Sequence, residues 1–221
     1  MPARERMTEL RGQILRMGSL AETILARAVE SVWERDAEAA TRVKDDDLEI
    51  DRSDVEIDRS VLRVLALTAP KADDLRAVIA IKTMATDLER VGDLARNIAR
   101  SALRLSARPQ IALPSGLERI AAGSRRLLSS ALDCFGSGDT AAARAVIEAD
   151  DEIDRIQDQI VQAAIARLAE EPTSAPQEVD VILIAEALER VADHATNIAE
   201  SVILLYDAEI VKHAAKLGSG R

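Results

Sequence analysis

The residues best suited to chemistry in this chain are acidic side chains that recur at a spacing of four. The pattern ExxxDxxxN occurs twice, about a hundred positions apart, and its members are Glu89, Asp93, Asn97, Glu189, Asp193 and Asn197. Residues four apart on an α-helix point to nearly the same side, so each copy predicts one stripe of oxygen-bearing side chains. Apolar residues gather on the opposite side, which places each stripe at the edge or surface of a helical bundle.

A shorter acidic row precedes each stripe. It has the pattern DxxxD, and its members are Asp47, Asp51, Asp150 and Asp154. Where a row and a stripe meet on neighbouring helices, two like charges about 5 Å apart cost about 3 kcal/mol at an effective dielectric constant near 20. We therefore expect the four carboxylates of each half to be neutralised, either by bound cations or by protonation at raised pKa values.

The donor atoms indicate which ions such sites would bind. The repeated positions carry oxygen donors without Cys or His, which favours iron, manganese, magnesium or calcium and argues against a tetrahedral structural zinc site. Four negative charges favour more than one ion per site. Asn97 and Asn197 could each ligate through the carbonyl oxygen or hydrogen-bond a carboxylate ligand. A lone ExxxD pair would indicate only solvated helix surface, and it is the recurrence in both halves that favours metal sites.

Some positions break the duplication. His194 stands where the first stripe has Leu94, and it lies off the axis of the acidic stripe. We interpret His194 as a supporting or structural residue rather than a ligand. Arg96 lies near the first stripe, whereas the second has Thr196 at that place. The two sites therefore need not bind ions equally well.

Long segments without helix breakers must position these side chains. Six Pro and nine Gly residues are gathered mostly in a few clusters. We predict six helices, separated at residues 33–36, 68–70, 108–114, 136–139 and 171–176. Asp36 and Asp139 precede helical segments and are the expected N-caps. Long helices with short connections predict antiparallel neighbours in an all-α fold.

An internal repeat divides the chain into two halves. Between residues 88–101 and 188–201, ten of fourteen positions are identical. The DxxxD rows repeat one helix earlier. We predict two tandem three-helix bundles of long antiparallel helices, with a first domain at residues 1–107 and a second at residues 108–221.

Composition excludes several classes of protein. The formal net charge is −10 with both signs well mixed, which argues against a general affinity for nucleic acid or anionic membrane. No stretch reaches the roughly 18 apolar residues of a membrane span, and the first residues do not form a secretory signal. We expect a cytoplasmic protein. Cys134 is the only cysteine, and we interpret it as a small buried apolar residue.

Taken together, these segments resemble the PhoU family of bacterial phosphate-transport accessory and regulatory proteins. The resemblance covers nearly the full length and rests on ELRGQILRMGSLAETILARAVE, the Asp47–Asp51 row, TAPKADDLR, DLERVGDLARNIA and ALERVADHATNIAES. It implies two similar three-helix bundles, a homodimer, and multinuclear metal clusters on the protein surface. Iron or manganese is the expected metal, with magnesium, calcium or zinc as alternatives.

The resemblance also implies site residues and partners. By position, one cluster would be held by Asp47, Asp51, Glu89, Asp93 and Asn97, and the other by Asp150, Asp154, Glu189, Asp193 and Asn197. The implied function is negative regulation of phosphate uptake and of the phosphate-starvation response. The implied partners are the Pst phosphate transporter, through its ATP-binding subunit, and a phosphate-sensing histidine kinase. Neither nucleic acid nor direct membrane insertion is expected, so the protein would associate peripherally with membrane complexes.

Two other functions compete with this one. A ferritin-like di-iron oxidase needs Glu-x-x-His on two helices, with the ligands facing the bundle interior, and neither His194 nor His213 fits that pattern. A purely structural helical adaptor would carry the acids only as surface charge. The sequence has no phosphate-binding loop, no glycine-rich nucleotide fingerprint and no paired nucleophile and base, so we predict that the protein is not an enzyme.

Overall fold

Six α-helices make up nearly all of the computed structural model, which describes residues 3–211. The helices are α1 (Ala3–Glu34), α2 (Ala37–Thr68), α3 (Asp73–Ser106), α4 (Ser115–Ser137), α5 (Thr140–Glu170) and α6 (Ala175–Asp207), with a single 3-10 turn, η1 (Pro172–Ser174), before α6. No strand occurs within residues 3–211. The predicted all-α fold, the six helices and the positions of the five breaks are confirmed.

The predicted helix starts have the expected chemistry. Asp36 accepts hydrogen bonds from the amides of Glu38 and Ala39, each at 2.9 Å. Asp139 accepts one from the amide of Ala142 at 2.9 Å. These carboxylates satisfy amide groups that have no partner inside the first turn. Local sequence signals therefore fix where α2 and α5 begin.

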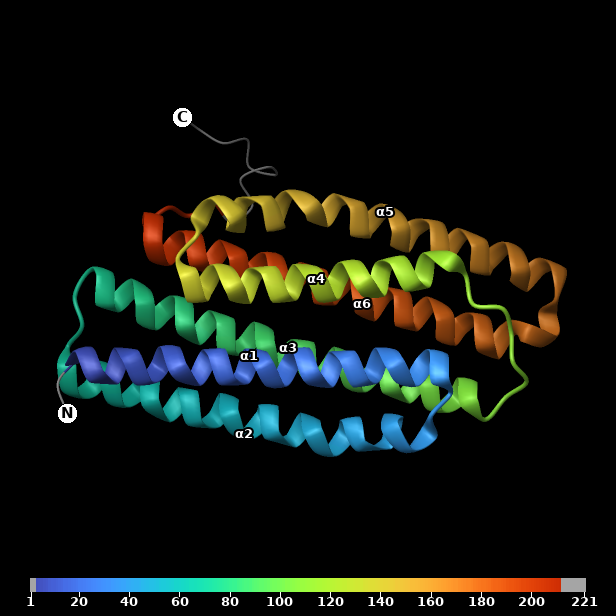
Figure 1. Ribbon diagram of the computed structural model, residues 1–221, viewed down its shortest axis with the longest axis horizontal. Helices are drawn as coiled ribbons and strands as arrows, with labels where there is room; N and C mark the ends of the chain where they lie inside the picture. Colours follow the sequence, from blue (N-terminus) through green and yellow to red (C-terminus); the bar gives the residue numbers. More distant parts are fainter. Residues whose placement is uncertain (1–2, 212–221) are drawn as a thin grey trace.

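The helices form two three-helix bundles that lie side by side with their long axes roughly aligned (Figure 1). One bundle contains α1, α2 and α3, and the other contains α4, α5 and α6. The bundles contact each other through α3 against α6 and α1 against α4. α3 and α6 run in opposite directions (Figure 1). The third helix of each half therefore carries an acidic stripe and also forms the junction between halves.

Small aliphatic side chains fill the core, with Phe135 as its aromatic member among the described residues. Close helix approach follows from this composition. A Cβ at Gly18 would lie 2.6 Å from Cδ2 of Leu132, so glycine is what lets α1 approach α4 at this point. Cys134 is 3 % exposed, as expected, and burial raises the pKa of its thiol.

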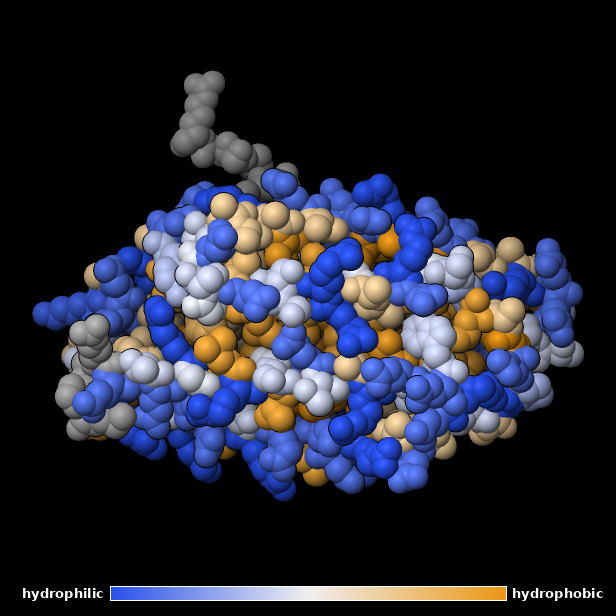
Figure 2. Space-filling model, viewed as in Figure 1, coloured by the Kyte–Doolittle hydropathy of each residue, from blue (hydrophilic) through white to orange (hydrophobic). Residues whose placement is uncertain are grey.

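Polar side chains cover most of the face seen in Figure 2, and apolar residues show between the helices. Within residues 3–211, none of the helices is both long enough and apolar enough to cross a membrane.

Candidate metal centres

The first acidic site lies between α2 and α3, and we define it as Asp47, Asp51, Glu89 and Asp93. Asp47 is 1 % exposed, Glu89 and Asp93 are partly buried, and Asp51 is exposed. The backbone of α3 can approach Asp47 because residue 92 is glycine. A Cβ at Gly92 would lie 2.8 Å from Oδ1 of Asp47. The fold therefore brings the four predicted carboxylates of the first half to one helix pair.

Arginine already neutralises part of the first acidic site. Arg96 donates hydrogen bonds to both Asp47 and Asp93 and forms an ion pair with each. Arg90 donates to Oδ2 of Asp93 at 3.3 Å and lies 3.5 Å from Oε2 of Glu89. The guanidinium group of Arg96 spans α2 and α3, a place that a bridging cation would also fill.

Two carboxylates of the first acidic site have raised pKa values. Burial raises the pKa of Asp47, although the charge of Arg96 opposes the shift. Burial also raises the pKa of Glu89, and the negative charge of Asp93 adds to the shift. Burial disfavours the ionised form, and neighbouring acids act in the same direction. The arginine therefore compensates this site only in part.

Two further acids lengthen the row on α2, and a lysine binds both. Nζ of Lys82 lies 3.2 Å from Oδ1 of Asp54 and 2.5 Å from Oδ1 of Asp58. The corresponding residues of the second half are Gln157, Val161 and Ile182. The lysine and both acids are absent together, so the extension is confined to the first half.

The second acidic site lies between α5 and α6, and we define it as Asp150, Asp154, Glu189 and Asp193. None of these carboxylates forms an ion pair with another residue in the described part of the chain. Oδ1 of Asp150 is buried and has no hydrogen-bond partner there. Thr196 takes the place of the bridging arginine, and its hydroxyl donates to the backbone oxygen of Asp193 at 2.7 Å.

Two carboxylates of the second acidic site have strongly raised pKa values. Burial raises the pKa of Asp150 to about 7, and the charges of Asp193 and Asp154 add to the shift. Burial raises the pKa of Glu189 to about 7 as well, with Asp193 and Asp154 adding and Arg190 opposing. Near neutral pH these two carboxylates can therefore take up a proton, and a cation bound there would compete with that proton.

Both acidic sites offer a donor set that suits hard or borderline cations. The buried, unpartnered Oδ1 of Asp150 is an oxygen that a cation could satisfy. Among the described side chains, no three His, Cys, Asp or Glu groups already converge to hold an ion. Ion binding would therefore require carboxylates to change rotamer and turn towards one another.

The asparagines predicted as further ligands lie towards the junction of α3 and α6. Nδ2 of Asn197 donates to Oδ1 of Asp87 at 3.2 Å. Oδ1 of Asn97 accepts from Arg100 at 3.4 Å. Neither amide hydrogen-bonds a carboxylate of its own acidic site. Nδ1 of His194 lies 2.9 Å from the same oxygen of Asp87, as expected of a residue with a supporting role.

The sequence analysis missed the buried acids that join the halves. Asp87 is 7 % exposed and receives the contacts from α6 described above. Asp180 is 1 % exposed and accepts hydrogen bonds from Arg104 of α3 and from Arg108 of the connection that follows α3. The repeat could have revealed both acids, because Asp87 corresponds to Ala187 and Asp180 corresponds to Ala80. A carboxylate that replaces alanine within a duplicated apolar pattern indicates a specific partner. His213, the other histidine, lies outside the described residues.

The chain matches the family model of the PhoU domain twice, at residues 14–102 and 117–202. These two ranges fall on either side of the predicted boundary at residue 107.

Similar proteins extend over nearly the whole chain. A PhoU homolog from Pseudomonas putida, a phosphate-specific transport system accessory protein, is 35 % identical over 210 residues, which cover 94 % of this chain and 81 % of that protein. The corresponding protein of Serratia marcescens is 30 % identical and is covered to 85 %. The crystal structure of PhoU from Pseudomonas aeruginosa superposes with a TM-score of 0.90 at 31 % identity, covering 94 % of this chain and all of the other. These relatives are described as accessory or regulatory proteins rather than enzymes, which confirms the prediction of a non-enzymatic protein.

Proposed function

We propose that this chain, which belongs to the PhoU family, is a metal-binding accessory protein of a phosphate-specific transport system. The second acidic site carries the metal part of the proposal. It combines four carboxylates, no ion pair within residues 3–211 and a buried oxygen of Asp150 without a partner. A bound cation would offset the negative charge of the carboxylates and would also give the buried oxygen of Asp150 a partner.

The proposed ligands are the carboxylates of both acidic sites, with the two asparagines as further candidates. Asp47, Asp51, Glu89 and Asp93 would hold ions between α2 and α3, and Asp150, Asp154, Glu189 and Asp193 would hold them between α5 and α6. Iron or manganese is the proposed metal. A bound ion would neutralise the facing carboxylates and tie two helices of each bundle together.

The transport part of the proposal is supported by the relatives, which are accessory proteins of phosphate-specific transport systems, and by a phosphate transport system regulatory protein PhoU of known structure from Streptococcus pneumoniae. The chain would act as a negative regulator of phosphate uptake and of the phosphate-starvation response. Its partners would be the ATP-binding subunit of the transporter and a phosphate-sensing histidine kinase. A homodimer in the cytoplasm, associated peripherally with these membrane complexes, completes the proposal.

Elemental analysis of protein purified without chelator tests the metal part. We expect iron or manganese in excess of one ion per chain, and a higher melting temperature after Mn²⁺ or Fe²⁺ is added to metal-free protein. A protein that retains no metal and melts at the same temperature with and without these ions would be a structural adaptor with acidic surfaces.

Recovery of the chain on membranes tests the partner part. We expect intact protein to co-purify with the transporter and the kinase. Asp47→Asn, Glu89→Gln, Asp150→Asn and Glu189→Gln variants would show whether that association needs the acidic sites. If folded variants and wild type were recovered equally on membranes, partner binding would not depend on the acidic sites.

A further inference from the structure

The junction of α3 and α6 is built differently at its two corresponding ends. Position i on α3 corresponds to position i + 100 on α6, and the helices are antiparallel (Figure 1). Each contact across the junction therefore has a counterpart in which the helices exchange roles. At one end Asp87 binds His194 and Asn197. Their counterparts at the other end are Ala187, Leu94 and Asn97.

A pocket lies at that other end, where Ala187 and Leu94 stand in place of an aspartate and a histidine. A cavity of about 280 Å³ lies between α3 and α6, and Leu94, Asn97 and Ala187 all line it. At about 30 Å³ for each water molecule, the cavity has room for a small polar group with part of its hydration shell. Methyl and isobutyl groups have replaced the carboxylate and imidazole that fill the other end.

Arginines surround this junction pocket. Arg100, Arg104 and Arg190 line it, and Glu186 is the acid among the lining residues. The counterparts of Arg100 and Arg104 at the other end of the junction are Glu200 and Leu204. The opened end has thus gained two arginines relative to the filled end.

The arginines of the junction pocket form few ion pairs with neighbouring acids. Arg104 binds Asp180, which also binds Arg108, so one carboxylate serves two guanidinium groups. Within residues 3–211, Arg100 and Arg190 form no ion pair. The Arg100 guanidinium donates to Asn97 at a long 3.4 Å. The lining therefore contains three arginines and one acid, Glu186, and one of these arginines is paired with Asp180.

We propose that the junction pocket binds a phosphate group, either free orthophosphate or the terminal phosphate of a larger molecule. Guanidinium groups match a tetrahedral oxyanion with paired, charge-assisted N–H donors. The amide of Asn97 and the hydroxyl of Ser101 are further donors in the lining. A chain of net charge −10 repels anions in general, so a local excess of arginine is what an anion site here requires. The site does not depend on metal at the acidic sites.

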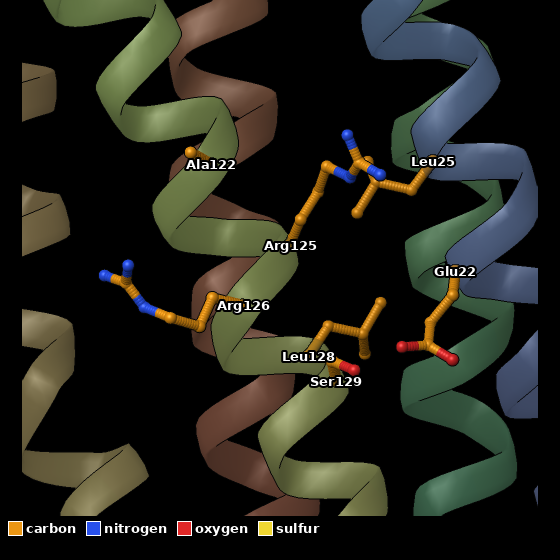
Figure 3. A pocket seen from close by; sticks show the side chains of 7 residues that line it. All are labelled: Glu22, Leu25, Ala122, Arg125, Arg126, Leu128 and Ser129. Carbon is orange, nitrogen blue, oxygen red and sulfur yellow. The ribbon is translucent and has the colours of Figure 1, made fainter.

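Arginines also line a second pocket, but without a comparable excess of positive charge. It lies between α1 and α4, encloses about 360 Å³ and is lined by Glu22, Arg125 and Arg126 among others. Arg125 extends towards α1, whereas Arg126 points to the opposite side (Figure 3). One inward arginine shares the lining with the acid Glu22, so this pocket has no comparable excess of positive charge. Arg126 is therefore a suitable control for the arginines of the junction pocket.

The test is calorimetric titration of full-length, metal-free protein with orthophosphate, and separately with pyrophosphate, at constant ionic strength with chloride as the control anion. Metal-free protein is used so that phosphate cannot bind through ions at the acidic sites. We expect saturable binding of one phosphate group per chain. Arg100→Gln and Arg190→Gln should each weaken binding about tenfold. Glu186→Gln should tighten it, and Arg126→Gln should leave it unchanged.

A double substitution checks the pocket itself. Leu94→His with Ala187→Asp rebuilds the filled end of the junction and should abolish phosphate binding while helicity is retained. The single arginine variants serve the same purpose if the double variant does not fold. Saturation by pyrophosphate but not orthophosphate would assign the site to a phosphate group of a larger molecule. No saturation by either anion, or equal weakening by Arg126→Gln and Arg190→Gln, would overturn the proposal.

Discussion

The two acidic sites contain corresponding carboxylates in different electrostatic surroundings. In the first, Arg96 binds Asp47 and Asp93. In the second, Thr196 replaces the arginine, and burial with neighbouring acids raises the pKa of Asp150 to about 7. The duplicated helices have kept their oxygen donors while the counter-charge has diverged. A bound cation would therefore stabilise the second acidic site more, because no side chain of the described residues forms an ion pair with its carboxylates.

The largest expected effect comes from giving the first acidic site the threonine of the second. Arg96→Thr leaves the carboxylate of Asp47, which is 1 % exposed, without its ion-pair partner. We expect metal-free protein to lose about 3 kcal/mol of unfolding free energy, because removing one partner of a buried ion pair strands the other charge. Urea unfolding in the presence of a chelator measures this. The reciprocal Thr196→Arg should stabilise metal-free protein and weaken ion binding at the second acidic site. If neither variant changed stability or ion binding, the arginine would not account for a difference between the two acidic sites.

The glycine beneath Asp47 gives the next largest effect. Gly92→Ala places a Cβ 2.8 Å from Oδ1 of Asp47 and 2.9 Å from Cδ1 of Ile50. We expect a loss of about 2 kcal/mol from overpacking, in spite of alanine's better helix propensity. Thermal or urea unfolding would show it. The matched change in the second half, Ala192→Gly, should cost about 1 kcal/mol through helix propensity and about 1 kcal/mol more through the loss of a buried methyl group. A Gly92→Ala variant more stable than wild type would contradict the close approach.

A smaller effect should depend on pH. The pKa of Asp150 is raised from 3.8 to about 7 in the folded protein. At pH values between these two, Asp150 is therefore protonated in the folded state and ionised in the unfolded state. The unfolding free energy should therefore fall as pH rises from about 4 to about 7. Metal-free Asp150→Asn should be more stable than wild type by about 1 kcal/mol at pH 8, after allowance for solvent screening, and should match wild type near pH 4. Unfolding curves of both proteins at both pH values provide the comparison. If Asp150→Asn were stabilised more at pH 4 than at pH 8, the pKa of Asp150 would not be raised in the folded protein.

The smallest expected effect concerns the extension of the first row. Lys82→Gln removes the partner of Asp54 and Asp58, and the lysine side chain is 38 % exposed. Partly exposed ion pairs contribute little, so we expect a loss of about 0.5 kcal/mol that disappears at high salt. Unfolding at low and at high ionic strength would measure it. A loss independent of salt would mean that Lys82 acts through packing instead.

The fold followed from the sequence because its signals are local. Helix breakers cluster at the connections, and Asp36 and Asp139 cap the helices that they precede. The pairing of the acidic rows followed from the repeat, since the same two patterns recur in the same order in both halves.

The directions of individual side chains could not be predicted from the sequence. Each step of four residues turns by about 40° on a helix, so Asn97 and Asn197 lie about 80° from the glutamate that begins their stripe. That turn carries them to the junction of α3 and α6. The contacts of Asp87 and Asp180 depend on how the two bundles dock, which periodicity within one helix does not specify.

The most direct test of the metal-site proposal compares the two halves in one titration. Metal-free wild type, Asp47→Asn/Glu89→Gln and Asp150→Asn/Glu189→Gln would each be titrated with Mn²⁺ or Fe²⁺ while melting temperature and bound metal are measured. We expect wild type to bind ions and melt at a higher temperature, and the Asp150→Asn/Glu189→Gln variant to lose most of that gain. Equal melting of wild type with and without metal, together with no bound metal after desalting, would contradict the proposal that these duplicated carboxylates are metal ligands.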